Sequence, residues 1–294
     1  MRKERKALDS DTVRLLWKWR RPGRLEPLTV PRLKLTIEYD GSRYVGWQVQ
    51  RNGRSVQAEL GEALGRLLGG DVEVVAAGRT DSGVHATGQV VCFDTERQLP
   101  LKAYHRGLNG LLPEDIAVVR AEEVSAAFDP RRWSRGKRYR YRVSNLPSRS
   151  PLRRHTHWEI YAPLQVEAMA RAATSLLGRH DYSAFRASDC QAAHAVREVR
   201  RLSVEGTPGD AVAFVVEGTA FLKHMVRNLV GTLVEVGKGR RPEAWVAEVL
   251  ASGDRTLAGP TAPPHGLVLE EVFYGDGPPP RQAGDSADVF EDSA

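Results

Sequence analysis

A single acidic residue, Asp81, lies in a glycine-rich segment between two apolar runs, and this arrangement constrains the fold more than any other feature. The apolar runs at residues 72–77 and 90–93 predict two strands, so the acid would sit on a tight loop that a sheet holds rigidly. Arg79 is two positions away, and a nearby positive charge favours the carboxylate form. This pattern is typical of a nucleophile or a base. An aspartate that satisfies the backbone of its own turn explains the spacing about as well.

The composition narrows the class of protein without identifying it. The chain has 294 residues, which suggests about two domains, and its net charge is +6. A basic surplus is consistent with nucleic-acid binding, but many basic proteins bind none, so the charge alone leaves the partner open. Cys92 and Cys190 form no CxxC pair, which argues against a zinc site built on thiolates. The sequence shows neither an apolar stretch long enough to span a bilayer nor a secretory signal, and we expect a cytoplasmic protein.

Composition shifts divide the chain into four parts. Residues 1–31 form a basic extension that we expect to be mobile, and residues 276–294 form an acidic tail that we expect to be disordered. Between them we expect an N-terminal α+β domain at residues 32–145, which carries the Asp81 loop, and a C-terminal α+β domain at residues 146–275. Both halves contain strands and two helices in similar order. The sequence therefore predicts a duplicated α+β unit with a mixed, largely antiparallel sheet and helices on one face.

A basic and aromatic strand is predicted at residues 137–142, which read KRYRYR. Alternation places Tyr139 and Tyr141 on one face and Arg138, Arg140 and Arg142 on the other. Tyrosines interleaved with cations suit a surface that stacks on bases and follows phosphates. An ordinary strand with tyrosines in the core and arginines in water fits the pattern equally well.

A helix is predicted over residues 221–236, with an apolar face that excludes Arg227. Arg227 could be a solvated arginine, or it could reach into a cleft. A buried arginine needs a carboxylate partner, and Asp81 is the obvious candidate. The pair His155 and His157 lacks a third ligand nearby, so we predict no metal site.

Several separate motifs, in order, resemble the tRNA pseudouridine synthase A family. The resemblance covers residues 33–274 and includes the Asp81 loop, the KRYRY strand and the Arg227 segment. Its remaining motifs are IEYDG and GWQ near residues 37–48, the segment from Asn109 to Ile116, and residues 262–267.

The resemblance implies two ferredoxin-like halves that share a central sheet beside a basic cleft. It further implies a homodimer, no metal or organic cofactor, and isomerisation of uridine to pseudouridine at positions 38, 39 and 40 of the tRNA anticodon arm. By motif position, Asp81 is the nucleophile and Arg227 is its ion-pair partner. Tyr139 stacks on the target base and could help to remove a proton, and Arg79 helps to hold the flipped-out nucleotide. The basic strand, with Lys137, Arg138 and Arg140, is expected to follow phosphates.

Two other functions remain open at this point. A related synthase could act on a different RNA or a different tRNA position with the same chemistry. A non-catalytic RNA-binding protein could use the same scaffold, but it would not need an acid facing a phosphate-rich ligand. A metal-dependent nuclease is disfavoured because the sequence lacks a carboxylate cluster.

Overall fold

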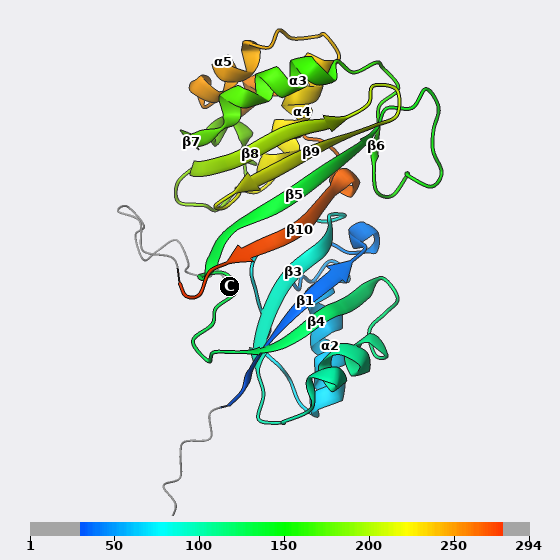
Figure 1. Ribbon diagram of the computed structural model, residues 1–294, viewed down its shortest axis with the longest axis vertical. Coiled ribbons are helices and arrows are strands. Elements are labelled where there is room, and N and C mark those ends of the chain that lie inside the picture. The colour runs from blue at the N-terminus through cyan, green and yellow to red at the C-terminus, as the bar shows by residue number, and fades with distance from the viewer. Residues whose placement is uncertain (1–29, 279–294) are drawn as a thin grey trace, which may run out of the picture. The chain divides into compact units, whose positions relative to one another are not determined.

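Alternating side chains in the first strand set the layers of the fold. In β1 (Arg32–Tyr39), Leu33, Leu35 and Ile37 are at most 3% exposed, whereas the residues between them lie on the other face of the strand. The structure is a computed structural model that describes residues 30–278. Figure 1 shows α2 (Val56–Leu68) behind β1 and α4 (Met225–Gly237) behind the strands of the second half, so the buried face of the sheet is the face that these helices cover.

One mixed, mostly antiparallel sheet runs through the described part of the chain, which confirms the α+β prediction. Its strand order is β4-β1-β3-β10-β5-β9-β8-β7, with β2 paired to β3 and β6 paired to β5. The bounds of the strands are β2 (Val75–Ala76), β3 (His85–Asp94), β4 (Ile116–Val124), β5 (Ser134–Ser144), β6 (Trp158–Glu159), β7 (Gly178–Asp181), β8 (Val196–Gly206), β9 (Ala211–Gly218) and β10 (Leu267–Tyr274).

The predicted first helix begins and ends where its capping residues require. Ser55 Oγ accepts a hydrogen bond from Ala58 N–H at 3.3 Å, and Gly69 ends α2 in the left-handed conformation with φ 84°. The segment after β3 contains a π-helical turn at Ala103–Gly107. The remaining α-helices are α3 (Val166–Ala173) and α5 (Trp245–Ser252).

The helix predicted from residue 221 begins four residues later than expected. His224 has φ 62° and ψ 0°, so the backbone leaves the helical region there and α4 starts at Met225. Phe221 therefore precedes the helix instead of belonging to its apolar face. Nothing in the pattern of apolar residues indicated this change of backbone.

The two halves of the sheet meet where β3 and β10 pair in parallel at Val268–His85 and Leu269–Ala86. Gly88 allows this approach because a Cβ atom at that position would lie 2.1 Å from the carbonyl oxygen of Glu270. The Asp81 loop directly precedes β3, and residues 259–266 directly precede β10. The pairing therefore brings two distant segments of the chain to the same end of the sheet.

The predicted chain termini lie largely outside the described residues. The mobility of residues 1–31 and the disorder of residues 276–294 therefore stay predictions. The expected boundary between residues 145 and 146 also stays a prediction. The strand order places β5, which ends at residue 144, between β10 and β9 of the second half.

Candidate active site

The Asp81 loop is held by its own turn and by the segment that follows β1. Val84 N–H donates to the carbonyl oxygen of Asp81 at 3.1 Å, and Gly83 takes φ 77° within this turn. Gly83 N–H and the Ser82 hydroxyl both donate to the carbonyl oxygen of Tyr44, at 3.3 and 3.2 Å. The carboxylate is thus presented from a fixed backbone, with its side chain 28% exposed.

Gly46 lets the second support approach the loop. It has φ 111°, and a Cβ atom there would lie 2.6 Å from the carbonyl oxygen of Thr80. Trp47 N–H donates to that same oxygen at 3.1 Å, and the Thr80 hydroxyl shares a 2.8 Å hydrogen bond with Tyr39. The GWQ motif therefore supports Thr80, the residue before Asp81.

His85 ties the far end of the loop to the second half of the sheet. Its Nδ1 lies 3.0 Å from the backbone nitrogen of Gly41 and 3.1 Å from Asp40 Oδ1. The Nε2 atom lies 2.9 Å from the carbonyl oxygen of His155 and 3.1 Å from that of His265. His155 and His157 thus belong to a structural junction in which His265 Nε2 bonds the carbonyl oxygen of His157 at 3.0 Å.

Arg227, in the first turn of α4, is the basic side chain that the structure brings to Asp81. Its Nη1 lies 3.4 Å from Asp81 Oδ2, and its side chain is 12% exposed. Its Nε donates to the carbonyl oxygen of Ala262 at 2.7 Å, and Ala262 N–H donates back to the carbonyl oxygen of Arg227 at 3.2 Å. The guanidinium is therefore oriented by the backbone before β10 as well as by the carboxylate.

A partly buried polar network fixes the segment that orients Arg227. Arg255 donates to the carbonyl oxygen of Gly259 at 2.9 Å, to Asn228 Oδ1 at 3.1 Å and to the Thr261 hydroxyl at 3.0 Å. Gly231 lets α4 contact this segment directly, since a Cβ atom there would lie 1.7 Å from the carbonyl oxygen of Pro260. The sequence did not predict this support for Arg227, because the residues that form the network share no sequence pattern.

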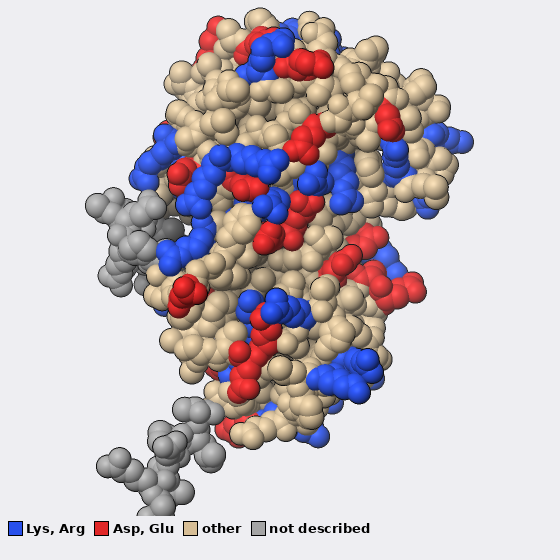
Figure 2. Space-filling model, viewed as in Figure 1, with Lys and Arg blue, Asp and Glu red and all other residues tan. Residues whose placement is uncertain are grey.

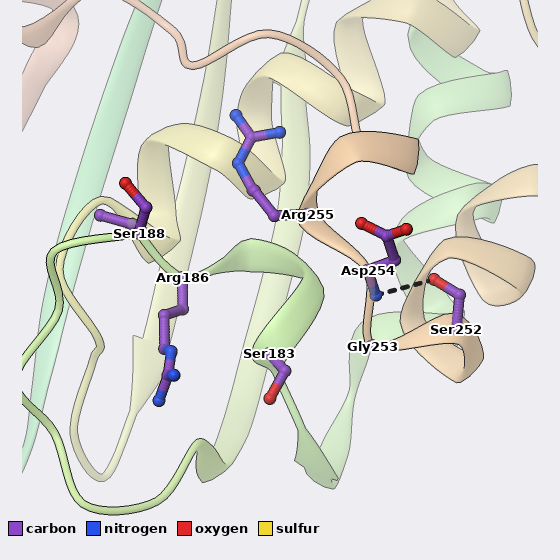
Figure 3. Close-up of a pocket in the computed structure, with 8 residues that line it drawn as sticks. Ser183, Arg186, Ser188, Ser252, Gly253, Asp254 and Arg255 are labelled. Carbon is purple, nitrogen blue, oxygen red and sulfur yellow. Dashed lines mark hydrogen bonds between the residues drawn. The ribbon is translucent and has the colours of Figure 1, made fainter.

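Figure 3 shows the surface cavity on the outer side of this network, with a volume of about 440 Å³. Ser252 Oγ accepts from Asp254 N–H at 3.1 Å beside it, and the Arg255 side chain points away from Asp254. The residues that line the cavity are Ser183, Arg186, Ala187, Ser188, Ser252, Gly253, Asp254 and Arg255. Asp81 is not among them, so this cavity is separate from the candidate chemistry.

Tyr139 lies on the buried face of β5, near the carboxylate. It is 8% exposed and packs edge-on against Phe221, with ring centroids 5.2 Å apart. Burial raises the pKa of Tyr139, and the charges of Tyr39 and Asp81 act in the same direction. The phenol is consequently protonated throughout the physiological range.

Lys137 shares the face of β5 that carries Tyr139, and it reaches the Asp81 loop. A Cβ atom at Gly78 would lie 2.4 Å from its Nζ, so the amine packs against the loop backbone. Burial, together with the positive charge of Arg131, lowers the pKa of Lys137 to about 8. Arg79 is exposed in the same loop, two residues before Asp81.

Arg138 and Arg140 lie on the opposite face of β5, as alternation predicted, and the structure does not bring them to Asp81. Arg138 contacts Glu217 at 2.8 Å and Glu271 at 2.9 Å, and Arg140 contacts Glu270 at 2.5 Å. Figure 2 shows acidic and basic side chains mixed over the central strands of this face. The role of these two arginines in substrate binding stays a prediction. In the structure both are already paired with glutamates.

His224 is the functional candidate that the sequence did not reveal. Its Nε2 lies 3.6 Å from Asp81 Oδ2, and its side chain is 29% exposed. Residue 224 was assigned to the interior of a helix, where it would have had another direction. Within residues 30–278, no group of three or more His, Cys, Asp and Glu side chains is arranged to hold a metal ion.

Comparison with known proteins identifies the family. The sequence profile described as tRNA pseudouridine synthase matches residues 35–131 and 172–275. The tRNA pseudouridine synthase A of Myxococcus xanthus is 73% identical over 263 residues, which cover 90% of this chain and 99% of that protein. The proteins of the same description from Geotalea uraniireducens and Pelobacter propionicus are 48% and 49% identical over 242 residues, covering 82% of this chain and 99% of each relative.

The chain therefore belongs to the tRNA pseudouridine synthase A family. It has tRNA pseudouridine synthase activity, which is an isomerase reaction of RNA modification. None of the helices in the described part of the chain combines the length and apolar character that a membrane crossing requires.

Proposed function

We propose that Asp81 is the nucleophile of this reaction, that Arg227 is its ion-pair partner, and that Tyr139 stacks on the target base. The observation that carries the proposal is the convergence of these residues from the β2–β3 loop, α4 and β5, with Arg227 Nη1 3.4 Å from the carboxylate. The rigid backbone around Asp81 supports it, because a nucleophile gains rate from being held in one geometry.

The chemistry requires an ionised carboxylate and an accessible base. The target uridine must leave the helical stack before a protein group can reach it. Asp81 then attacks either C1′ of the ribose or C6 of the uracil, and the N1–C1′ glycosidic bond breaks. The base turns so that C5 bonds to C1′, and the bond to Asp81 breaks, which restores the carboxylate. C5 finally loses its proton and N1 gains one, so the product is an isomer of the substrate. The raised pKa of Tyr139 supports a stacking role, since a protonated phenol is a poor proton acceptor.

The substrate assignment within tRNA is part of the proposal. We assign the target uridines to positions 38, 39 and 40 of the anticodon arm, and the enzyme to the cytoplasm, where its substrate is found. Arg79 lies in the Asp81 loop and the Lys137 amine packs against Gly78 of the same loop, and both supply the positive charge that RNA phosphates need. With Arg227 they form the basic cleft of the proposal.

The strand order supports two ferredoxin-like halves. In the second half, the four long strands β5, β8, β9 and β10, named in sequence order, lie in the order β10-β5-β9-β8, with the short strands β6 and β7 outside them. In the first half, β1, β2, β3 and β4 lie in the corresponding order β4-β1-β3-β2. This repetition favours a boundary between residues 124 and 134. A homodimer completes the proposal, and sedimentation analysis would test it.

The decisive experiment measures tritium release from tRNA carrying [5-³H]uridine, with wild type and with Asp81→Asn. We expect release by the wild type only, while both proteins bind tRNA equally well. Asp71→Asn, at an exposed position after α2, is the matched control and should retain full activity. Activity in Asp81→Asn would refute the nucleophile, and loss of tRNA binding alone would assign Asp81 to recognition.

A second experiment tests the assigned positions. Transcripts in which uridine 38, 39 or 40 is replaced by cytidine should each lose release from that position only. Unchanged release from a transcript that lacks all three uridines would move the target elsewhere in the tRNA.

A further inference from the structure

His224 is the only residue other than glycine with a positive φ in the described part of the chain. Residues other than glycine seldom adopt φ 62°, although histidine does so more often than most, and such strain persists where the surrounding structure imposes it. Strained residues of this kind cluster at functional sites, which makes the direction of the His224 side chain informative.

The backbone on both sides of His224 is fixed. The carbonyl oxygen of Lys223 accepts from Ala187 N–H at 3.0 Å, and the Lys223 amine is paired with Asp189. The carbonyl oxygen of His224 accepts from Asn228 N–H at 2.9 Å in the first turn of α4. The His224 side chain makes no capping hydrogen bond to that helix. The strained backbone is thus not explained by the start of the helix.

The imidazole is instead directed at the candidate nucleophile. His224 Nε2 lies 3.6 Å from Asp81 Oδ2, the same oxygen that Arg227 Nη1 approaches at 3.4 Å. Because both side chains flank Oδ2, Oδ1 is the oxygen better placed to attack. The left-handed backbone at residue 224 thus accompanies a side chain that reaches the same carboxylate oxygen as Arg227.

We propose that His224 is a positioning residue for Asp81, which holds the carboxylate in its attacking orientation while the imidazole is uncharged. The inference rests on the proposed nucleophilic role of Asp81. When the imidazole gains a proton, it becomes a second cation on Oδ2, competes with Arg227 and makes the carboxylate a poorer nucleophile.

The charges around the imidazole are consistent with an uncharged state at neutral pH. Asp81 faces it from the β2–β3 loop, Arg227 from α4, Lys223 from the preceding residue and Asp189 from the segment after Phe185. Burial lowers the pKa of His224 below its ordinary value of 6.5, as do Arg227 and Lys223, although the two carboxylates act in the opposite direction. The imidazole is therefore harder to protonate than that of a free histidine.

The test replaces the imidazole without disturbing the backbone. His224→Asn and His224→Gly both tolerate positive φ, so either variant should fold with a melting temperature close to that of the wild type. At pH 7.5 we expect kcat to fall about ten- to a hundredfold, with KM changed by less than about twofold. We also expect the acid limb of the kcat profile to move to lower pH. His105→Asn, in the π-helical turn, is the matched control and should change neither quantity.

An unchanged kcat, or an acid limb that stays in place in both variants, would overturn the role of His224. Asp81→Asn is measured in parallel to separate this result from the proposed function. If Asp81→Asn is inactive while the His224 variants behave as wild type, only the present inference fails. If Asp81→Asn is active, the nucleophile itself is wrong.

Discussion

If Lys137 binds RNA, its titration should make the affinity for tRNA depend on pH. Its amine packs against Gly78 in the Asp81 loop, and burial lowers its pKa to about 8. An amine with this pKa is charged at pH 7 and largely neutral at pH 9. If Lys137 contacts an RNA phosphate, its contribution to affinity is present below pH 8 and is lost as the pH rises.

The size of the effect follows from the pKa. A bound phosphate stabilises the ammonium form, so only the free enzyme loses a proton between pH 7 and pH 9. The charged fraction of a group with a pKa of about 8 falls about tenfold over this range, and the dissociation constant should rise by about the same factor. The reaction rate at saturating tRNA should change much less.

The assay measures tRNA affinity with the Asp81→Asn protein at pH 7 and pH 9, at constant ionic strength. Constant salt matters because each phosphate contact makes the affinity depend on salt. In an Asp81→Asn background, Lys137→Arg keeps its charge at both pH values and serves as the control. A tenfold rise that is the same in the lysine and arginine proteins would show that another group titrates, and would refute the reasoning.

Three further predictions concern the supports of the site. Arg227→Lys should lower kcat about tenfold or more with tRNA binding retained, because an amine cannot keep both contacts of the guanidinium; steady-state kinetics would decide it. Tyr139→Phe should leave kcat within about threefold, since the buried phenol stays protonated, and a larger fall would assign the hydroxyl a proton transfer. Gly46→Ala should cost roughly 1–3 kcal/mol of stability and lower kcat, because its Cβ would meet the carbonyl oxygen of Thr80; thermal denaturation and activity measure the two effects.

The sequence predicts local structure well where one residue dominates. Ser55 and Gly69 set the ends of α2, and the alternation in residues 137–142 placed the arginines opposite Tyr139. The alternation did not predict which acidic residues pair with those arginines. A register shift between Leu269 and Glu271 brings both Glu270 and Glu271 to the face that carries Arg138 and Arg140, and such a shift leaves no mark in a periodic pattern.

A contact between distant segments could be predicted only where the chemistry of one residue requires a particular partner. A buried arginine needs an acid, which suggested Asp81 for Arg227 across 146 residues of chain. No chemical requirement predicted the left-handed backbone at His224, since a histidine inside an apolar helical pattern gives no reason to expect positive φ. The strain therefore became visible only in the structure, together with the second contact to the carboxylate.

Arg227 is held mainly by the scaffold and only secondarily by the acid. Its 2.7 Å hydrogen bond to Ala262 is short and charge-assisted, whereas its contact with Asp81 is 3.4 Å long. The residues just before Ala262 are held in turn, because Arg255 bonds Gly259 and Thr261, and the Thr261 hydroxyl donates to Asn228. Arg227 should consequently keep its place when Asp81 is replaced. We therefore expect Asp81→Asn to remove the chemistry while leaving the fold and the affinity for tRNA intact. Replacing Arg255 should lower stability and catalysis together.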